Sequence, residues 1–127
     1  MAQRLPPDLE NKLVEAQRLQ EQLNRVVQER VALESEKSEI ERVLKLLEEV
    51  GENEVYRSVG GILVKVPKEK VVNELKDRLE IIDLRLEKLR RQESELRKRL
   101  EQLLREIREA QAKLQPGAQL GKKGGAS

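Results

Sequence analysis

Apolar residues recur every three or four positions along two long stretches of the chain, residues 8–50 and 67–115. A sustained seven-residue repeat predicts two long helices that pack as a left-handed coiled coil. Apolar residues occupy 21 of the 25 positions of this repeat, which we call the seam. The seam runs through Leu9, Lys12, Ala16, Leu19, Leu23, Val26, Arg30, Leu33, Lys37, Ile40, Leu44 and Leu47, and then through Val72, Leu75, Leu79, Ile82, Leu86, Leu89, Glu93, Leu96, Leu100, Leu103, Ile107, Ala110 and Leu114.

The residues at the ends of both stretches agree with these limits. Asp8 and Glu10 place negative charge at the start of the first helix, where the helix dipole favours it. Gly51 suits the position just after its end. Pro67 suits the first position of the second helix, because its missing N–H would have no partner there. A Pro/Gly/Ser/Lys-rich segment, residues 116–127, follows the second helix and is expected to be disordered.

The two seams can pair with each other if the chain reverses near residue 60. An antiparallel arrangement then brings Leu19 to Leu103 and makes each arm roughly 60–70 Å long. The polar seam residue of the second helix, Glu93, falls opposite Arg30, a polar seam residue of the first. We therefore predict that Arg30 and Glu93 form a register-setting pair.

The segment between the helices, residues 54–66, has the pattern of a β-hairpin. Gly60 and Gly61 supply the positive φ values of a two-residue loop, and β-branched residues flank them. A lone two-stranded hairpin is marginally stable in water. We therefore expect hairpins from several subunits to join into a sheet or barrel; the alternative is a simple connector packed on its own helix ends. The predicted oligomerisation residues are Val55, Tyr56, Val59, Gly60, Gly61, Ile62, Leu63, Val64 and Val66.

Composition narrows the function further. The chain is 39% charged and has one Tyr but no Phe, Trp, His or Cys. Thiol chemistry, disulfides and histidine-based catalysis are therefore excluded, and a two-helix arm offers no concave pocket for an enzyme. We expect no catalytic residues, no cofactor and no metal. The chain has no 18-residue apolar run and no signal-like segment, so we expect no membrane association and a cytoplasmic location.

The net charge of +2 argues against nucleic acid as a partner, because nucleic-acid binders usually carry a basic excess on one face. The chain also lacks an aromatic platform for base stacking. A nucleic-acid-binding coiled coil is nevertheless an alternative, and its binding would be steeply salt-dependent. It would use Arg90, Arg91, Arg97, Lys98, Arg99, Lys122 and Lys123.

The order helix, VYRSVGGILVK hairpin, helix resembles the prefoldin family, in particular its archaeal β-type subunits. The resemblance covers residues 5–115 and includes the LPP start, the Gly-Gly turn and Lys65. We expect residues 1–115 to form a single domain. Pro67 is a local departure, since a Thr or Ser cap is expected there. The fold class is then mostly α, a long antiparallel two-helix coiled coil whose inserted hairpin joins an oligomeric β-barrel platform.

The resemblance implies a subunit of an ATP-independent chaperone, a hexamer of two α and four β subunits. Such a chaperone holds non-native proteins at its coiled-coil tips, prevents aggregation and delivers them to a group II chaperonin. Fraying helix ends would expose apolar groups for clients. The alternative is a scaffold coiled coil that oligomerises without binding clients. The predicted client-binding residues are Leu5, Leu9, Leu13, Val14, Leu104, Ile107, Ala110 and Leu114.

Overall fold

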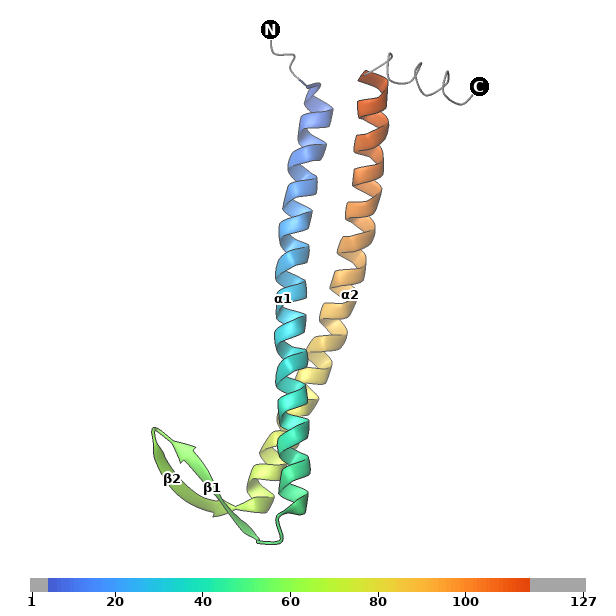
Figure 1. Cartoon of the computed structure of the whole chain (residues 1–127). Helices are drawn as coiled ribbons and strands as arrows, with labels where there is room; N and C mark the ends of the chain where they lie inside the picture. Colours follow the sequence, from blue (N-terminus) through green and yellow to red (C-terminus); the bar gives the residue numbers. More distant parts are fainter. Residues whose placement is uncertain (1–4, 115–127) are drawn as a thin grey trace, which may run out of the picture. The chain divides into compact units, whose positions relative to one another are not determined.

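The structure, a computed structural model, describes residues 5–114 and shows two long helices packed together with an antiparallel β-hairpin between them. Helix α1 spans Pro7–Glu49 and helix α2 spans Lys68–Leu114. Strands β1, Glu54–Val59, and β2, Ile62–Pro67, lie between them in the sequence (Figure 1). The fold is mostly α, as predicted, whereas the predicted disordered tail, residues 116–127, lies outside the described residues.

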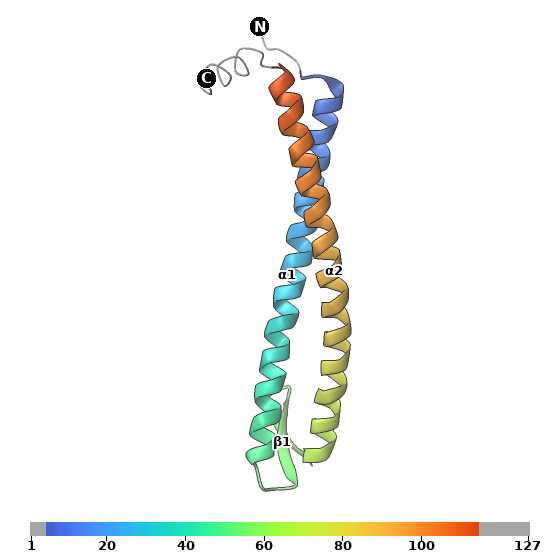
Figure 2. The ribbon, with the colours of Figure 1, turned by 90° about the vertical axis from the view of Figure 1, so that its right-hand side faces the viewer.

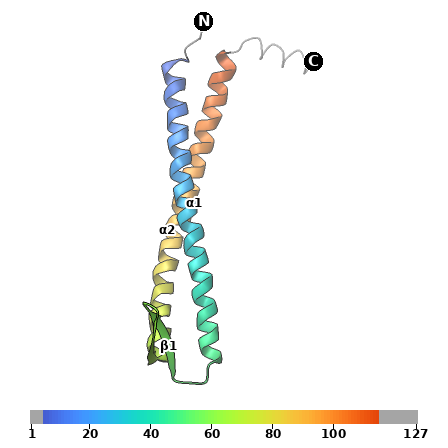
Figure 3. The ribbon, with the colours of Figure 1, turned by 60° about the vertical axis from the view of Figure 1, so that its left-hand side comes forward.

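The chain forms two compact units. One contains the residues through Val27 and those from Arg91 onward, and the other contains Gln28–Arg90. In the first unit the early turns of α1 lie beside the late turns of α2 (Figure 2). In the second unit the hairpin lies at the end of the helices where α1 ends and α2 begins (Figure 3). The single domain expected over residues 1–115 stays a prediction.

Each unit has its own apolar core. In the first, buried residues of both helices form one cluster that includes Leu9, Leu19, Leu103 and Ile107. In the second, the buried side chains are Leu33, Ile40, Ile82, Leu86 and Leu89. All the buried apolar residues of the described chain belong to the predicted seam, so this prediction is confirmed. Leu114 is the exception in the seam, since its side chain is exposed in the last turn of α2.

The start of α2 differs from the prediction. Pro67 ends β2, paired with Glu54, and the helix begins at Lys68. The backbone N–H of Lys68 donates to the carbonyl of Asn53 at 2.7 Å, so the hairpin ladder continues past Pro67. Proline is tolerated in this strand because residue 67 occupies a position whose N–H would point away from β1.

The end of α1 also differs from the prediction. The helix ends at Glu49, and the positive φ values of the described residues belong to Gly60 and Gly61 rather than to Gly51. The Lys68 ammonium instead donates to the carbonyl of Val50 at 2.7 Å. A cation at a helix C-terminus satisfies a free carbonyl and complements the dipole. The lysine that begins α2 therefore caps α1.

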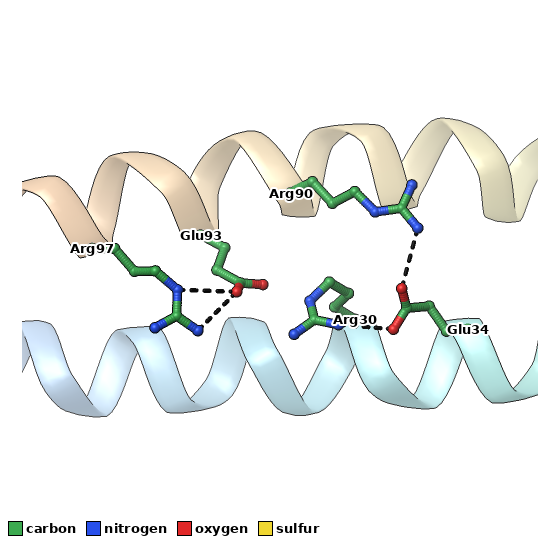
Figure 4. A network of polar contacts seen from close by, with 5 residues as sticks. All are labelled: Arg30, Glu34, Arg90, Glu93 and Arg97. Carbon is green, nitrogen blue, oxygen red and sulfur yellow. Dashed lines mark hydrogen bonds and ion pairs between the residues drawn. The ribbon is translucent and has the colours of Figure 1, made fainter.

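Ion pairs tie the helices together in the second unit. Glu34 of α1 accepts hydrogen bonds from Arg30 of its own helix at 2.8 Å and from Arg90 of α2 at 3.1 Å (Figure 4). Arg78 donates twice to Glu36, at 2.6 and 2.8 Å. Because these pairs join residues of opposite helices, they favour one register over its neighbours.

The predicted pair of Arg30 and Glu93 joins residues of different units and stays a prediction. Within its own unit, Glu93 is half-buried and accepts hydrogen bonds from Arg97 at 2.9 and 3.1 Å (Figure 4). Lys12, a polar seam residue of α1, lies 3.7 Å from Glu106 of α2. Lys37, another polar seam residue, donates to Asp83 of α2 at 2.7 Å. Polar seam positions are therefore compatible with packing because their charges find partners.

These contacts shift the titration of the groups involved. The guanidinium of Arg90 lowers the pKa of the Glu34 carboxyl by hydrogen bonding, against a smaller desolvation effect. Arg78 lowers the pKa of Glu36 in the same way. The carboxylate of Asp83 raises the pKa of the Lys37 ammonium. All three shifts stabilise the charged form of the group in the folded chain.

Ile82→Ala should strongly destabilise the chain, because the Ile82 side chain is 0% exposed in the core of the second unit. Removing its buried atoms leaves a cavity, which costs about 2–5 kcal/mol. Ile81→Ala is the matched control, since the neighbouring isoleucine is 50% exposed. Urea unfolding followed by circular dichroism measures both; equal destabilisation by the two variants would contradict the assigned core.

Glu36→Gln should remove an acid-dependent part of the stability. Because the pKa of Glu36 is lowered in the folded chain, the charged carboxylate contributes its full stabilisation at pH values above the ordinary pKa of a glutamate. This stabilisation is lost as the pH falls through the lowered pKa. The gap between the unfolding midpoints of the native chain and the variant should therefore be largest near neutrality and close below about pH 4. Glu48→Gln, at an exposed position near the end of α1, is the control. A gap that persists unchanged in acid would contradict the assigned pairing.

Candidate functional site

The hairpin has the register that a two-residue Gly60-Gly61 loop predicts. Val59 pairs with Ile62, Arg57 with Val64 and Val55 with Val66. Gly60 and Gly61 form the turn with φ values of 56° and 82°. Two consecutive positive φ values are typical of a type I′ turn, whose twist matches that of the flanking strands. The backbone geometry of the turn therefore favours glycine at both positions.

The hairpin exposes much of its apolar surface. The side chains of Ile62 and Leu63 are each 68% exposed, and that of Tyr56 is 65% exposed. Ile62 and Leu63 are adjacent in one strand, so they lie on opposite faces of the hairpin. Val55 and Val66, near its base, are half-buried. Both faces of the loop half of the hairpin are thus apolar and uncovered within the described chain.

The base of the hairpin is fixed to the helices of the second unit. Arg57 donates to Glu74 of α2 at 2.5 Å. The bonds from Lys68 to Asn53 and Val50 hold the other side of the base. The hairpin therefore extends from a fixed base, to one side of the helix ends (Figure 1). Arg57 interrupts the apolar face in the sequence, and the structure explains it as an anchor.

The predicted client-binding residues fall into two groups at the helix ends of the first unit. Leu9 and Ile107 are buried in the core cluster, and Leu13 and Ala110 pack against it. A second group is exposed and lies outside the core; it consists of Leu5, Val14, Leu104 and Leu114. The structure thus separates the residues that close the arm from those that are accessible on its surface.

Two kinds of residue were not predicted from the sequence. The first kind fixes the base of the hairpin, and the second consists of exposed apolar residues on the helices. Lys68 and Glu74 hold the hairpin base, but their partners lie 17 or 18 residues away and no short motif marks them. Leu46, Ile81 and Leu84 are exposed apolar residues outside the seam. Their departure from the seven-residue repeat was the signal that could have found them.

No helix between residues 5 and 114 is long and apolar enough to cross a membrane. No group of three or more acidic side chains in this range is arranged to hold a metal ion.

Comparisons with known proteins point to one family. A family model described as "Prefoldin subunit" matches residues 10–114. The prefoldin β subunit of Sulfurisphaera tokodaii is 42% identical over 117 residues, which cover 91% of this chain and 94% of that protein. The prefoldin β subunit of Sulfolobus acidocaldarius is 40% identical over 124 residues, which cover 97% of this chain and 99% of that protein.

Solved structures agree with this result. The crystal structure of the prefoldin β subunit from Thermococcus strain KS-1 matches with a TM-score of 0.74 and 34% identity, covering 86% of this chain and 96% of that one. The β2 subunit from the same strain matches with a TM-score of 0.62 and 24% identity, covering 71% of this chain and 97% of that one, which shows the fold alone.

Gly61→Ala should destabilise the hairpin, because its φ of 82° is unfavourable for any residue with a Cβ atom. The expected cost is about 1–2 kcal/mol and arises from the backbone, since nothing lies within 4 Å of the added carbon. Gly51→Ala is the matched control: its Cβ also meets open space, and its φ is not positive. Amide exchange at Arg57 and Val64 measures the effect, and equal exchange in both variants would contradict it.

Proposed function

Because the chain belongs to the prefoldin family as a β subunit, we propose that it assembles through its hairpin and holds non-native proteins at its helix ends. Membership implies a chaperone role in a non-enzymatic family and a hetero-oligomer with α subunits. The finer steps are the hexamer of two α and four β subunits, client holding and delivery to a group II chaperonin in the cytoplasm. These steps are our proposal for this chain.

The exposed hairpin supports assembly and is the observation that carries the proposal. Tyr56, Ile62 and Leu63 would leave a large apolar surface in water if the chain stayed alone. Surfaces of this kind mark protein interaction sites. A two-stranded sheet also leaves both edges unpaired, and neighbouring strands can satisfy them. Joining hairpins of several subunits into a β-barrel platform buries the faces and pairs the edges at once.

The helix ends of the first unit support client binding. Val14 and Leu104 are exposed apolar residues on helices whose remaining surface is largely polar. Burying an exposed leucine or valine against a client would contribute about 1.5–3 kcal/mol. Each contact is weak, but several arms of one oligomer act together through effective concentration. The buried residues Leu9 and Ile107 would join the contact where the terminal turns open.

Replacing Leu5, Val14 and Leu104 together by serine should weaken suppression of aggregation several-fold, because these residues supply accessible apolar contacts. The hetero-oligomer formed with an α subunit should keep its mass by light scattering, since the hairpin is unchanged. Suppression is measured as light scattering by a heat-denatured client protein. The matched control replaces Ile81 and Leu84, which are also exposed on a helix but belong to the second unit.

The outcomes of this experiment distinguish a chaperone that binds clients from a scaffold coiled coil that does not. Loss of suppression in the first variant alone supports client binding at the helix ends. Unchanged suppression would overturn that placement. An oligomer that forms but never suppresses aggregation, even with the native chain, would support the scaffold coiled coil instead.

A further inference from the structure

The residues that flank the seam differ between the two units. In each seven-residue repeat the seam occupies positions a and d, with Leu9 at a, and position e follows d. In the second unit every e residue is charged; these residues are Glu34, Glu41, Glu48, Glu69, Lys76, Asp83 and Arg90. In the first unit the e residues are Leu13, Gln20, Val27, Arg97, Leu104 and Gln111. Five of these six are uncharged, so ion pairing between the helices does not explain them.

The e residues of both helices lie on the same side of the antiparallel pair. Glu34 and Arg90 are both e residues, and they are bonded at 3.1 Å. Position g precedes a and lies on the opposite side: Glu36 and Arg78 are both g residues, and they are bonded at 2.6 Å. The repeat continues through the first unit without interruption, so the same assignment of sides applies there.

The two sides of the first unit have different chemistry. On the g side the helices border a hollow that is lined by charged residues, among them Glu15 and Arg99. On the e side Leu13 and Val27 pack against the core cluster but remain partly exposed. Leu104 is 44% exposed on this side. The apolar surface of the core therefore continues onto the e side.

The polar residues of the e side are uncharged or already bonded. Gln20 and Gln111 are exposed amides, and Gln20 donates to Asn24 at 2.9 Å. Arg97 donates to Glu93 of its own helix. A docked segment would therefore leave no charge of this side without its present partner. We call the uncharged e residues the e stripe; they are Leu13, Gln20, Val27, Leu104 and Gln111.

A helix is the kind of segment that the e stripe fits. Apolar residues at a and d alone are sufficient for a two-helix coiled coil, whereas an apolar face that also includes e is typical of helices in a larger bundle. The e stripe repeats every seven residues on both helices, which matches the periodicity of a third helix. An extended segment repeats every two residues and would not match it.

Charges beside the e stripe favour a particular kind of helix. Glu10 of α1 lies one turn from Leu13, and Arg108 of α2 lies one turn from Leu104. Both charged residues are exposed. A helix lying between them would gain from a basic residue on the edge that faces α1 and an acidic residue on the edge that faces α2.

We propose that the e stripe binds an amphipathic helical segment of a non-native protein, which completes a three-helix bundle with α1 and α2. The inference rests on the proposed client binding at the helix ends of the first unit. It adds the side of the arm that makes the contact and the class of segment that is bound.

Two labelled peptides test the class of segment. The first has three heptads with leucine at a, d and e, and lysine, glutamate or serine elsewhere. In the second, proline replaces the serine at the central f position, which disrupts the helix and keeps every leucine. Fluorescence anisotropy measures the binding of each peptide to the hetero-oligomer formed with an α subunit. The helical peptide should bind at least about tenfold more tightly.

Equal affinity for the two peptides, or binding of neither, would overturn the inference. The proposed function has its own readout, which is suppression of aggregation by the same hetero-oligomer. If suppression is intact while the peptides are not distinguished, only the inference fails. If the native hetero-oligomer suppresses nothing, the proposed client binding fails as well.

Two double variants test the side of the arm. Gln20→Glu with Gln111→Glu places two charges on the e stripe, where a docked helix would bury them without partners. Gln92→Glu with Gln102→Glu is the matched control, because these exposed residues lie at g and at the neighbouring position c. The first variant should bind the helical peptide at least about tenfold more weakly, and the control within about twofold of the native chain.

Both variants change the net charge equally, so a difference between them reports the side of contact. Urea unfolding midpoints close to that of the native chain show that both arms remain folded. Equal weakening by the two variants would overturn the assignment to the e side. A drop in the mass of the free chain by light scattering in the first variant alone would show that a second copy occupies the e stripe, which would overturn the proposed occupant.

Discussion

Burial of one narrow apolar stripe is the constraint on which the rest of this structure depends. Two helices packed side by side can cover only the residues that face each other, so each helix buries about two positions in seven. Ile82 and Leu86 are fully covered, whereas their neighbours Ile81 and Leu84 are exposed. The remaining positions of the helices are in contact with water, which explains why so much of the chain is charged.

This constraint gives each apolar residue outside the stripe a separate meaning. In a globular domain an exposed leucine is ordinary, because much of any protein surface is apolar. On an arm with one buried stripe, the exposed Val14 and Leu104 have no structural role that packing explains. The same argument is stronger for the hairpin, because Ile62 is exposed on one face of the two-stranded sheet and Leu63 on the other. Apolar groups placed where the chain itself cannot cover them are the physical basis of an interaction protein.

The charged residues have different tasks according to their partners. Pairs four residues apart on one helix, such as Arg105 with Glu101, contribute only a few tenths of a kcal/mol. Pairs that join α1 to α2, such as Glu36 with Arg78, also select the register of the helices. The bonds of Arg57 and Lys68 have a third task, since they fix the base of the hairpin while its loop half stays exposed.

Much of this protein followed from its sequence because the signals are local and periodic. The seven-residue repeat identified the buried residues, and Gly60-Gly61 identified the turn and hence the pairing of Val59 with Ile62. The tertiary structure decided what depends on residues distant in the sequence. It assigned Pro67 to the end of a strand, made Lys68 the cap of α1, and gave Glu34 its partner Arg90. It also separated the accessible Leu104 from the buried Ile107, although both were expected to meet clients. Periodicity reports which face of a helix is apolar, but only the packed helices determine which of those side chains water can still reach.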